Sequence, residues 1–104
     1  MRKLSTILLF TLSQTNQWGA PIERIAFGSC AKENRPQPIW NSVHAFQPEL
    51  WIWMGDCYYG DSVDPEVLAA KASKQKLVPG YLRLRDSCAV IGVWDDHDYG
   101  INNG

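Results

Sequence analysis

Three short polar segments each follow an apolar run, and their side chains include types that bind metal ions or transfer protons. The segments are Gly-Ser-Cys at residues 28–30, Gly-Asp-Cys-Tyr-Tyr-Gly-Asp at 55–61 and Asp-Asp-His-Asp-Tyr-Gly-Ile-Asn-Asn-Gly at 95–104. Thiolates, carboxylates and imidazoles are common metal ligands, and an imidazole can also protonate a leaving oxygen. Carboxylates that lie close together repel one another and take up protons unless a cation neutralises them. If the three segments meet, a site for more than one metal ion is the economical explanation.

Each of these residues also has a purely structural interpretation. Cys30 could be a small buried residue, since free cysteines are often buried and inert. Asp56 could serve a turn after Gly55, and Tyr59 could be an ordinary packing aromatic. Residues 95–98 could form a solvated charged turn. The clustering favours the metal interpretation, because grouped carboxylates beside a histidine are candidates for metal binding or catalysis.

The residues between the polar segments must position them, and their pattern predicts strands that alternate with helices. Apolar runs that end at glycine or aspartate indicate strands at 25–27, 50–54 and 88–94. The run at 50–54 is apolar throughout, as expected for a strand that is buried on both faces. Helices are expected at 38–46 and at 64–77, and one more turn could form at 81–85. This alternation predicts an α/β fold with a parallel sheet of about three strands.

The predicted sheet places all three polar segments at one edge. Open parallel sheets bind ligands at the carboxyl ends of their strands, and each polar segment follows such an end. We expect Asp61 to be an ordinary loop residue and Asp64 to cap a helix. Cys88 would begin the third strand, at the edge opposite Cys57. A disulfide needs Cα atoms within about 7 Å, so these two thiols are not expected to pair.

The composition of the chain excludes several classes of protein. Its 104 residues suffice for one small domain. Ten Lys and Arg against eleven Asp and Glu give a net charge of −1, so no nucleic-acid-binding surface is expected. No apolar run reaches the roughly 20 residues of a membrane span. Nothing in the sequence indicates an oligomeric state.

The beginning of the chain has the pattern of a secretory signal. Arg2 and Lys3 form a short basic start, and an apolar stretch follows at residues 4–12. This pattern predicts a signal peptide over about residues 1–20, and hence a secreted or extracytoplasmic protein. A buried N-terminal helix or strand is the alternative.

Taken together, the three polar segments resemble the first half of the catalytic domain of PhoD-like (alkaline phosphatase D) metallophosphatases. The similarity runs from about residue 22 to residue 104 and includes Pro-Ile-Trp at 38–40 and Leu-Trp-Ile-Trp at 50–53. It implies a metallophosphatase sandwich, in which helices flank two mixed sheets. It also implies hydrolysis of small-molecule phosphate monoesters or diesters at a metal cluster that contains iron, with calcium.

The resemblance assigns metal ligands residue by residue. Cys30 matches a thiolate ligand, and Asp56 matches the carboxylate that bridges two metals. Tyr59 matches the phenolate ligand that is typical of ferric iron. Asp96 matches a further ligand, and Asp95 could take its place because the doubled aspartate leaves the register open.

His97 matches the catalytic histidine of the resemblance, which assists the phosphate or the leaving group. Asp98 is expected to orient His97 rather than to bind metal.

The end of the chain departs from the family, which continues well beyond the third segment. We therefore expect residues 21–104 to be the N-terminal part of a metallophosphatase domain, with negligible phosphatase activity of their own. The alternative is a catalytically inactive remnant or a small metal-binding protein, and a third hypothesis is a secreted interaction domain with exposed aromatic side chains. An incomplete sandwich of this kind would leave both sheet edges unpaired and one apolar face exposed.

Overall fold

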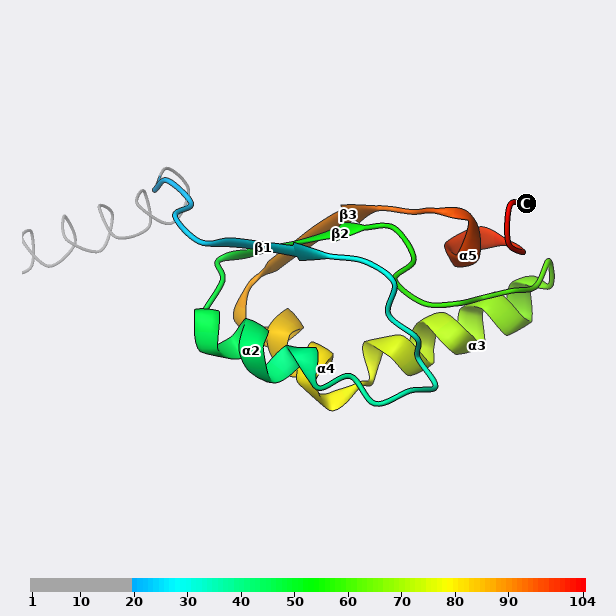
Figure 1. Cartoon of the computed structure of the whole chain (residues 1–104), viewed down its shortest axis with the longest axis horizontal. Helices are drawn as coiled ribbons and strands as arrows, with labels where there is room; N and C mark the ends of the chain where they lie inside the picture. The colour runs from blue at the N-terminus through cyan, green and yellow to red at the C-terminus, as the bar shows by residue number, and fades with distance from the viewer. Residues whose placement is uncertain (1–19) are drawn as a thin grey trace, which may run out of the picture.

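A computed structural model describes residues 20–104, in which strands and helices alternate (Figure 1). The elements are β1 (Ile25–Gly28), α2 (Ile39–Phe46), β2 (Leu50–Met54), α3 (Pro65–Lys76), α4 (Pro79–Ser87), β3 (Ala89–Val93) and α5 (Asp96–Tyr99). The predicted signal peptide falls on residues 1–20, and all but its last residue lies outside the described part of the chain.

The three strands form one open parallel sheet in the order β1-β2-β3. Ile52 in the central strand pairs with Phe27 of β1 and with Ile91 of β3. A parallel pair needs a crossover connection, and the helices between the strands supply it. The predicted α/β class and the parallel sheet are therefore confirmed, and so is the expectation that β1 and β3 are left as free edges among the described residues.

The core lies on one face of the sheet, where α2 and α4 cover the central strand (Figure 1). Trp51 and Trp53 point from β2 into this face and contact Trp40 of α2. Their ring centroids lie 5.0 and 5.9 Å, respectively, from that of Trp40. Tyr81 and Leu84 of α4 complete the cluster, and Leu84 is fully buried. Large aromatic side chains thus fill the space between sheet and helices, which fits the high tryptophan content of so short a chain.

The opposite face of the sheet is uncovered in the part of the chain that the structure describes. Phe27, Met54, Ile91 and Val93 point to this side and are 67%, 58%, 55% and 65% exposed. The expectation that residues 50–54 are buried on both faces is therefore wrong here. Successive side chains of a strand point to opposite faces, and α2, α3 and α4 lie on one side of the sheet while α5 lies beyond its end, as Figure 1 shows.

The helix boundaries follow from capping residues. Asp64 accepts a hydrogen bond from the backbone N–H of Glu66 at 2.9 Å, and Pro65 takes the first helical position, so α3 begins as predicted. The helix α4 is longer than the single turn expected at residues 81–85, because Pro79 begins it. Gly80 allows α4 to approach α2, since a Cβ there would lie 2.4 Å from the Cβ of Trp40.

Two further expectations concern cysteines and membranes. Cys30, Cys57 and Cys88 are all free thiols, and Cys57 follows β2 whereas Cys88 precedes β3, at opposite ends of the parallel pair. None of the helices found between residues 20 and 104 has the length and apolar character that crossing a membrane requires.

Candidate metal centre

The three polar segments meet at the carboxyl edge of the sheet, as their positions after the strands predict. The N–H of Ala31, after β1, donates to the carbonyl oxygen of Asp56, after β2, at 3.0 Å. The N–H of Gly60 donates to the carbonyl oxygen of His97 in α5 at 2.7 Å. The Sγ of Cys30 lies 3.7 Å from the Asp56 carboxylate. Backbone contacts thus join the loops in pairs, and side chains capable of binding metal lie between them.

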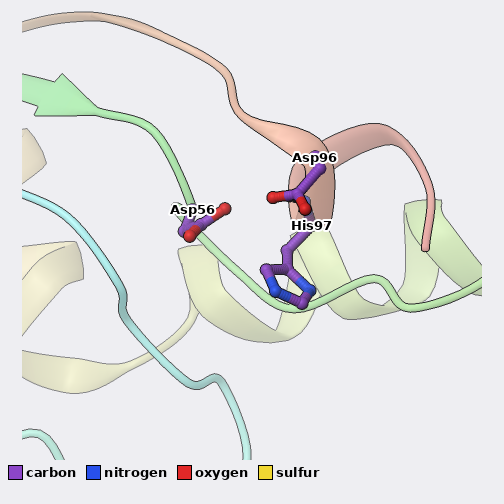
Figure 2. A group of neighbouring side chains, drawn as sticks. All are labelled: Asp56, Asp96 and His97. Carbon is purple, nitrogen blue, oxygen red and sulfur yellow. Dashed lines mark hydrogen bonds between the residues drawn. The ribbon is translucent and has the colours of Figure 1, made fainter. Parts of the chain in front are cut away.

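Asp56, Asp96 and His97 form the group at the centre of this edge, which we call the metal group. One ligand atom from each lies within 4.8 Å of the other two. Figure 2 shows Asp56 on the loop after β2 facing Asp96 and His97 on α5. These three residues belong to the set that the sequence suggested, and they come from two segments that are 40 residues apart in the chain.

Asp56 is the residue that most clearly indicates a cation in the metal group. Asp56 is only 9% exposed, and its Oδ1 atom is buried without a hydrogen-bond partner among the described residues. Burying a carboxylate oxygen without a partner costs free energy, so such atoms normally have one. A metal ion between Asp56, Asp96 and His97 would supply that partner.

Turns with positive φ angles position the side chains of Cys30 and Asp56. Cys30 and Asp56 adopt left-handed conformations, with φ of 61° and 51°. Aspartate adopts this region more readily than most residues, whereas for Cys30 the conformation is unusual, and strained residues cluster at functional sites. Gly55 precedes Asp56 with a φ of 96°, and a Cβ on it would lie 2.8 Å from that of Asp95. The two loops therefore pack closely enough to hold Asp56 against α5.

The pKa values of the Asp56 and Asp96 carboxyl groups are shifted in opposite directions. Burial raises the pKa of Asp56 above its usual value, and Asp95, Asp96 and Asp98 add to this while His97 opposes it. The N–H of Asn103 donates to Asp96 at 2.5 Å and lowers the pKa of that carboxyl. Asp56 is thus the carboxylate that gains most from a nearby cation.

Asp98 holds the loop after β2 instead of orienting His97, which corrects the expectation from the sequence. Its buried carboxylate accepts hydrogen bonds from the backbone N–H groups of Asp56 and Cys57, both at 2.7 Å, and of Asp95 at 2.9 Å. The same carboxylate closes a capping box with Asp95 at the start of α5. The spacing of Asp95 and Asp98 was the sequence signal for this role.

Asp95 caps α5, so the structure brings Asp96 rather than Asp95 into the metal group. The Asp95 carboxylate accepts from the N–H of Asp96 at 2.9 Å, and the residue is exposed. A capping carboxylate is already engaged by the backbone at the helix N-terminus. Between the two alternatives that the doubled aspartate left open, the geometry favours Asp96.

His97 is oriented by Asp61, which was expected to be an ordinary loop residue. The Nδ1 atom of His97 lies 2.5 Å from the Asp61 carboxylate, and this hydrogen bond raises the pKa of His97. A neutral imidazole that donates its Nδ1–H to a carboxylate presents the lone pair of Nε2, the arrangement common among metal-bound histidines. Asp61 is therefore a positioning residue for His97.

Tyr59 and Cys30 lie beside the metal group. The rings of Tyr59 and His97 have centroids 4.3 Å apart, and the Nζ of Lys32 lies 4.9 Å from the Tyr59 ring. Burial, and next a hydrogen bond with Cys30, raise the pKa of Tyr59 to about 12. The phenol is therefore neutral at ordinary pH, and only a strongly Lewis-acidic ion would convert it to a phenolate ligand.

Two residues that sequence reasoning missed fix the loop that carries Tyr59. Glu33 is 7% exposed, and its carboxylate accepts the N–H of Tyr59 at 3.0 Å. The Lys71 ammonium of α3 donates to the carbonyl oxygens of Tyr59 and Gly60 at 3.1 and 2.9 Å. Neither belongs to a motif, since both meet the loop only through tertiary folding.

Comparison of the chain with protein-family models, with curated proteins and with solved structures finds no match. What the chain can do therefore has to be inferred from the residues that meet at the carboxyl edge of its sheet.

Proposed function

We propose that the metal group is part of the site of a secreted, metal-dependent phosphoric ester hydrolase, as the resemblance to PhoD-like metallophosphatases implies. One observation carries the proposal: Asp56, whose buried Oδ1 has no hydrogen-bond partner among residues 20–104, brings a carboxylate oxygen within 4.8 Å of ligand atoms of Asp96 and His97, where a cation could bind. The uncovered apolar face of the sheet is consistent with a metallophosphatase sandwich, in which a second sheet packs on that face.

The donor types suit the metals that the resemblance suggests. Carboxylates and imidazole bind iron, and carboxylate oxygens also bind calcium. Cys30 lies beside Asp56 and the Tyr59 ring lies beside His97, and a thiolate and a phenolate from these two residues would favour iron over magnesium. When bound, such ions would hold a phosphate group and lower the pKa of a water molecule.

We assign complementary roles to the residues of the group. Asp56 and Asp96 would bind the metal. His97 would stabilise the phosphate or protonate the leaving oxygen, and the raised pKa that Asp61 gives it favours the protonated form. A His97 that binds metal through Nε2 could not also act as this acid, so the two roles of His97 exclude each other.

A second candidate function is metal binding without turnover, in a remnant or a small metal-binding protein. It is favoured by the number of donors, because the metal group has three and a two-metal hydrolytic site needs more. This count covers only the described residues. The small number of donors is also the reason why we expect negligible turnover from the described residues.

Metal binding and phosphate binding separate the two candidates. The chain would be titrated with Fe²⁺ or Ca²⁺ by calorimetry, and the loaded protein then with inorganic phosphate. Asp56→Asn should abolish metal binding, whereas Asp86→Asn, an exposed substitution in α4, should leave it unchanged. Metal binding followed by phosphate binding supports the hydrolase site, and metal binding alone supports the second candidate. Absence of metal binding to the wild-type chain rules out both.

A further inference from the structure

A groove with a volume of about 800 Å³ lies beside β1 and α2, on the covered side of the sheet. Apolar side chains form most of its wall, among them Trp40 and Val43 of the core and the exposed Phe46. Its volume is within the range of small-molecule sites, which are mostly apolar with a few polar groups that fix orientation.

Trp51 contributes a buried aromatic ring to the wall of this groove. Trp51 lines the groove and is 4% exposed, yet its Nε1–H has no acceptor among residues 20–104. The two other core indoles are satisfied: Trp40 donates to Gln37 at 2.8 Å and Trp53 to Tyr81 at 3.0 Å. The Trp51 indole N–H is itself covered by protein, so what Trp51 offers a ligand in the groove is aromatic surface rather than a hydrogen-bond donor.

The polar rim of the groove is cationic. Lys32 and Arg35 line it, and no carboxylate does. Neither side chain forms an ion pair with a described carboxylate. A ligand that complements this groove is therefore apolar in its body and anionic at one end.

The anionic end of such a ligand would lie next to the metal group. Cys30 lines the groove, and its Sγ is 3.7 Å from the Asp56 carboxylate. Lys32 also lines the groove while its Nζ stands over the ring of Tyr59. The groove and the metal group thus share a border at the loop after β1.

We infer that the groove binds the aryl group of an aryl phosphate ester whose phosphate lies at the metal group. This inference rests on the proposed function for the position of the phosphate, but the groove, its cations and Trp51 are independent of any metal. Aromatic walls favour an aryl body over an alkyl chain, because offset and edge-to-face contacts add to the burial of apolar area.

Phenylphosphonate and methylphosphonate test the inference, because they cannot be hydrolysed and differ only in the aryl group. The full chain would be labelled with ¹⁵N, and Trp51→Phe would identify the Trp51 indole resonance among those of the five tryptophans. In the presence of a chelator, phenylphosphonate should shift that resonance and bind at least about tenfold more tightly than methylphosphonate. Equal affinities, or an unmoved Trp51 resonance, would overturn the inference.

A matched pair of variants locates the binding site. Ser42 of α2 lines the groove, whereas its exposed neighbour Asn41 does not. Ser42→Trp should fill the groove and weaken phenylphosphonate binding about tenfold or more, and Asn41→Trp should bind as the wild type does. Equal weakening in both variants, or none in Ser42→Trp, would place the aryl group elsewhere.

The same titrations distinguish this inference from the proposed function. Aryl selectivity without any metal binding would support the groove and reject the hydrolase site. Metal-dependent phosphate binding without aryl selectivity would support the hydrolase site and reject the groove.

Discussion

At the residue scale, the metal group depends on side chains that bind no metal themselves. The carboxylate of Asp98 gathers N–H groups from both loops, Asp61 orients His97, and Glu33 and Lys71 fix the backbone around Tyr59. Such supporting contacts set the geometry of metal ligands and are a large part of their affinity. The candidate ligands are therefore held in place by the folded loops before any ion binds.

Asp98→Asn tests this support directly. The amide keeps the shape of the side chain but replaces one acceptor oxygen by an NH₂ group that faces backbone donors. We expect a loss of about 1–3 kcal/mol in the free energy of unfolding, together with weaker metal binding. Urea titrations followed by tryptophan fluorescence would measure the stability, and Asp86→Asn, exposed in α4, should change it by less than about 0.5 kcal/mol. A fully stable Asp98→Asn chain would contradict the role given to this carboxylate.

At the scale of elements, the sheet has one covered and one open face. Alternate residues of β3 go to opposite sides: Val90 packs against the core cluster, whereas Val93 is 65% exposed. The helices α2 and α4 lie together because Gly80 lets their backbones approach. The stability of the described residues should therefore come from one face of the sheet.

The same substitution on the two faces tests this asymmetry. Val90→Thr puts a hydroxyl group against the core and should cost about 1–2 kcal/mol. Val93→Thr makes an identical change on the open face and should cost less than about 0.5 kcal/mol. Both replacements keep a β-branched side chain, so the preference of each site for a strand is nearly unchanged. Equal costs in chemical denaturation would show that the open face is covered in solution.

At the scale of the whole molecule, the charge is nearly balanced, but the acidic groups are concentrated at the carboxyl edge. The free energy of unfolding at alkaline pH should therefore show how strongly the fold favours the neutral forms of the Cys57 thiol and the Tyr59 phenol at this edge. Burial, and next the Asp98 carboxylate, raise the pKa of Cys57 from 9.0 to about 12, and burial is also the main cause that raises the pKa of Tyr59 from 10.0 to about 12. Between the ordinary and the raised values, the folded chain holds protons that the unfolded chain releases.

The free energy of unfolding should accordingly fall as the pH rises. The contribution of Cys57 is complete below about pH 9 and is lost toward about pH 12, because the unfolded state binds fewer protons in this range. Urea midpoints measured from about pH 8 to about pH 11 should decrease, and the decrease should be smaller in Cys57→Ala. A midpoint that stays constant over this range in the wild-type chain would refute the prediction.

The sequence by itself determined the three strands, the helices α2 and α3 and the edge at which the polar segments meet, whereas it did not predict α5 and indicated only a single turn where α4 forms. Apolar runs and capping residues are local signals, and Asp64 with Pro65 placed the start of α3 correctly. The position of each polar segment after a strand was enough to bring Asp56 and His97 to one edge, since parallel strands all end there.

Only the tertiary structure decided which carboxylate does what. Asp95, Asp96 and Asp98 are the same residue type, and their roles differ only because of where α5 begins. Asp95 caps the helix, Asp96 belongs to the metal group, and Asp98 accepts hydrogen bonds from the loop after β2. The open face of the sheet was likewise decided by where the helices pack. A continuous apolar run such as β2 does not indicate whether one or both faces of the strand are covered. Long-range contacts between loops carry no local signal, which is why Glu33 and the partnership of Asp61 with His97 appear only in the folded chain.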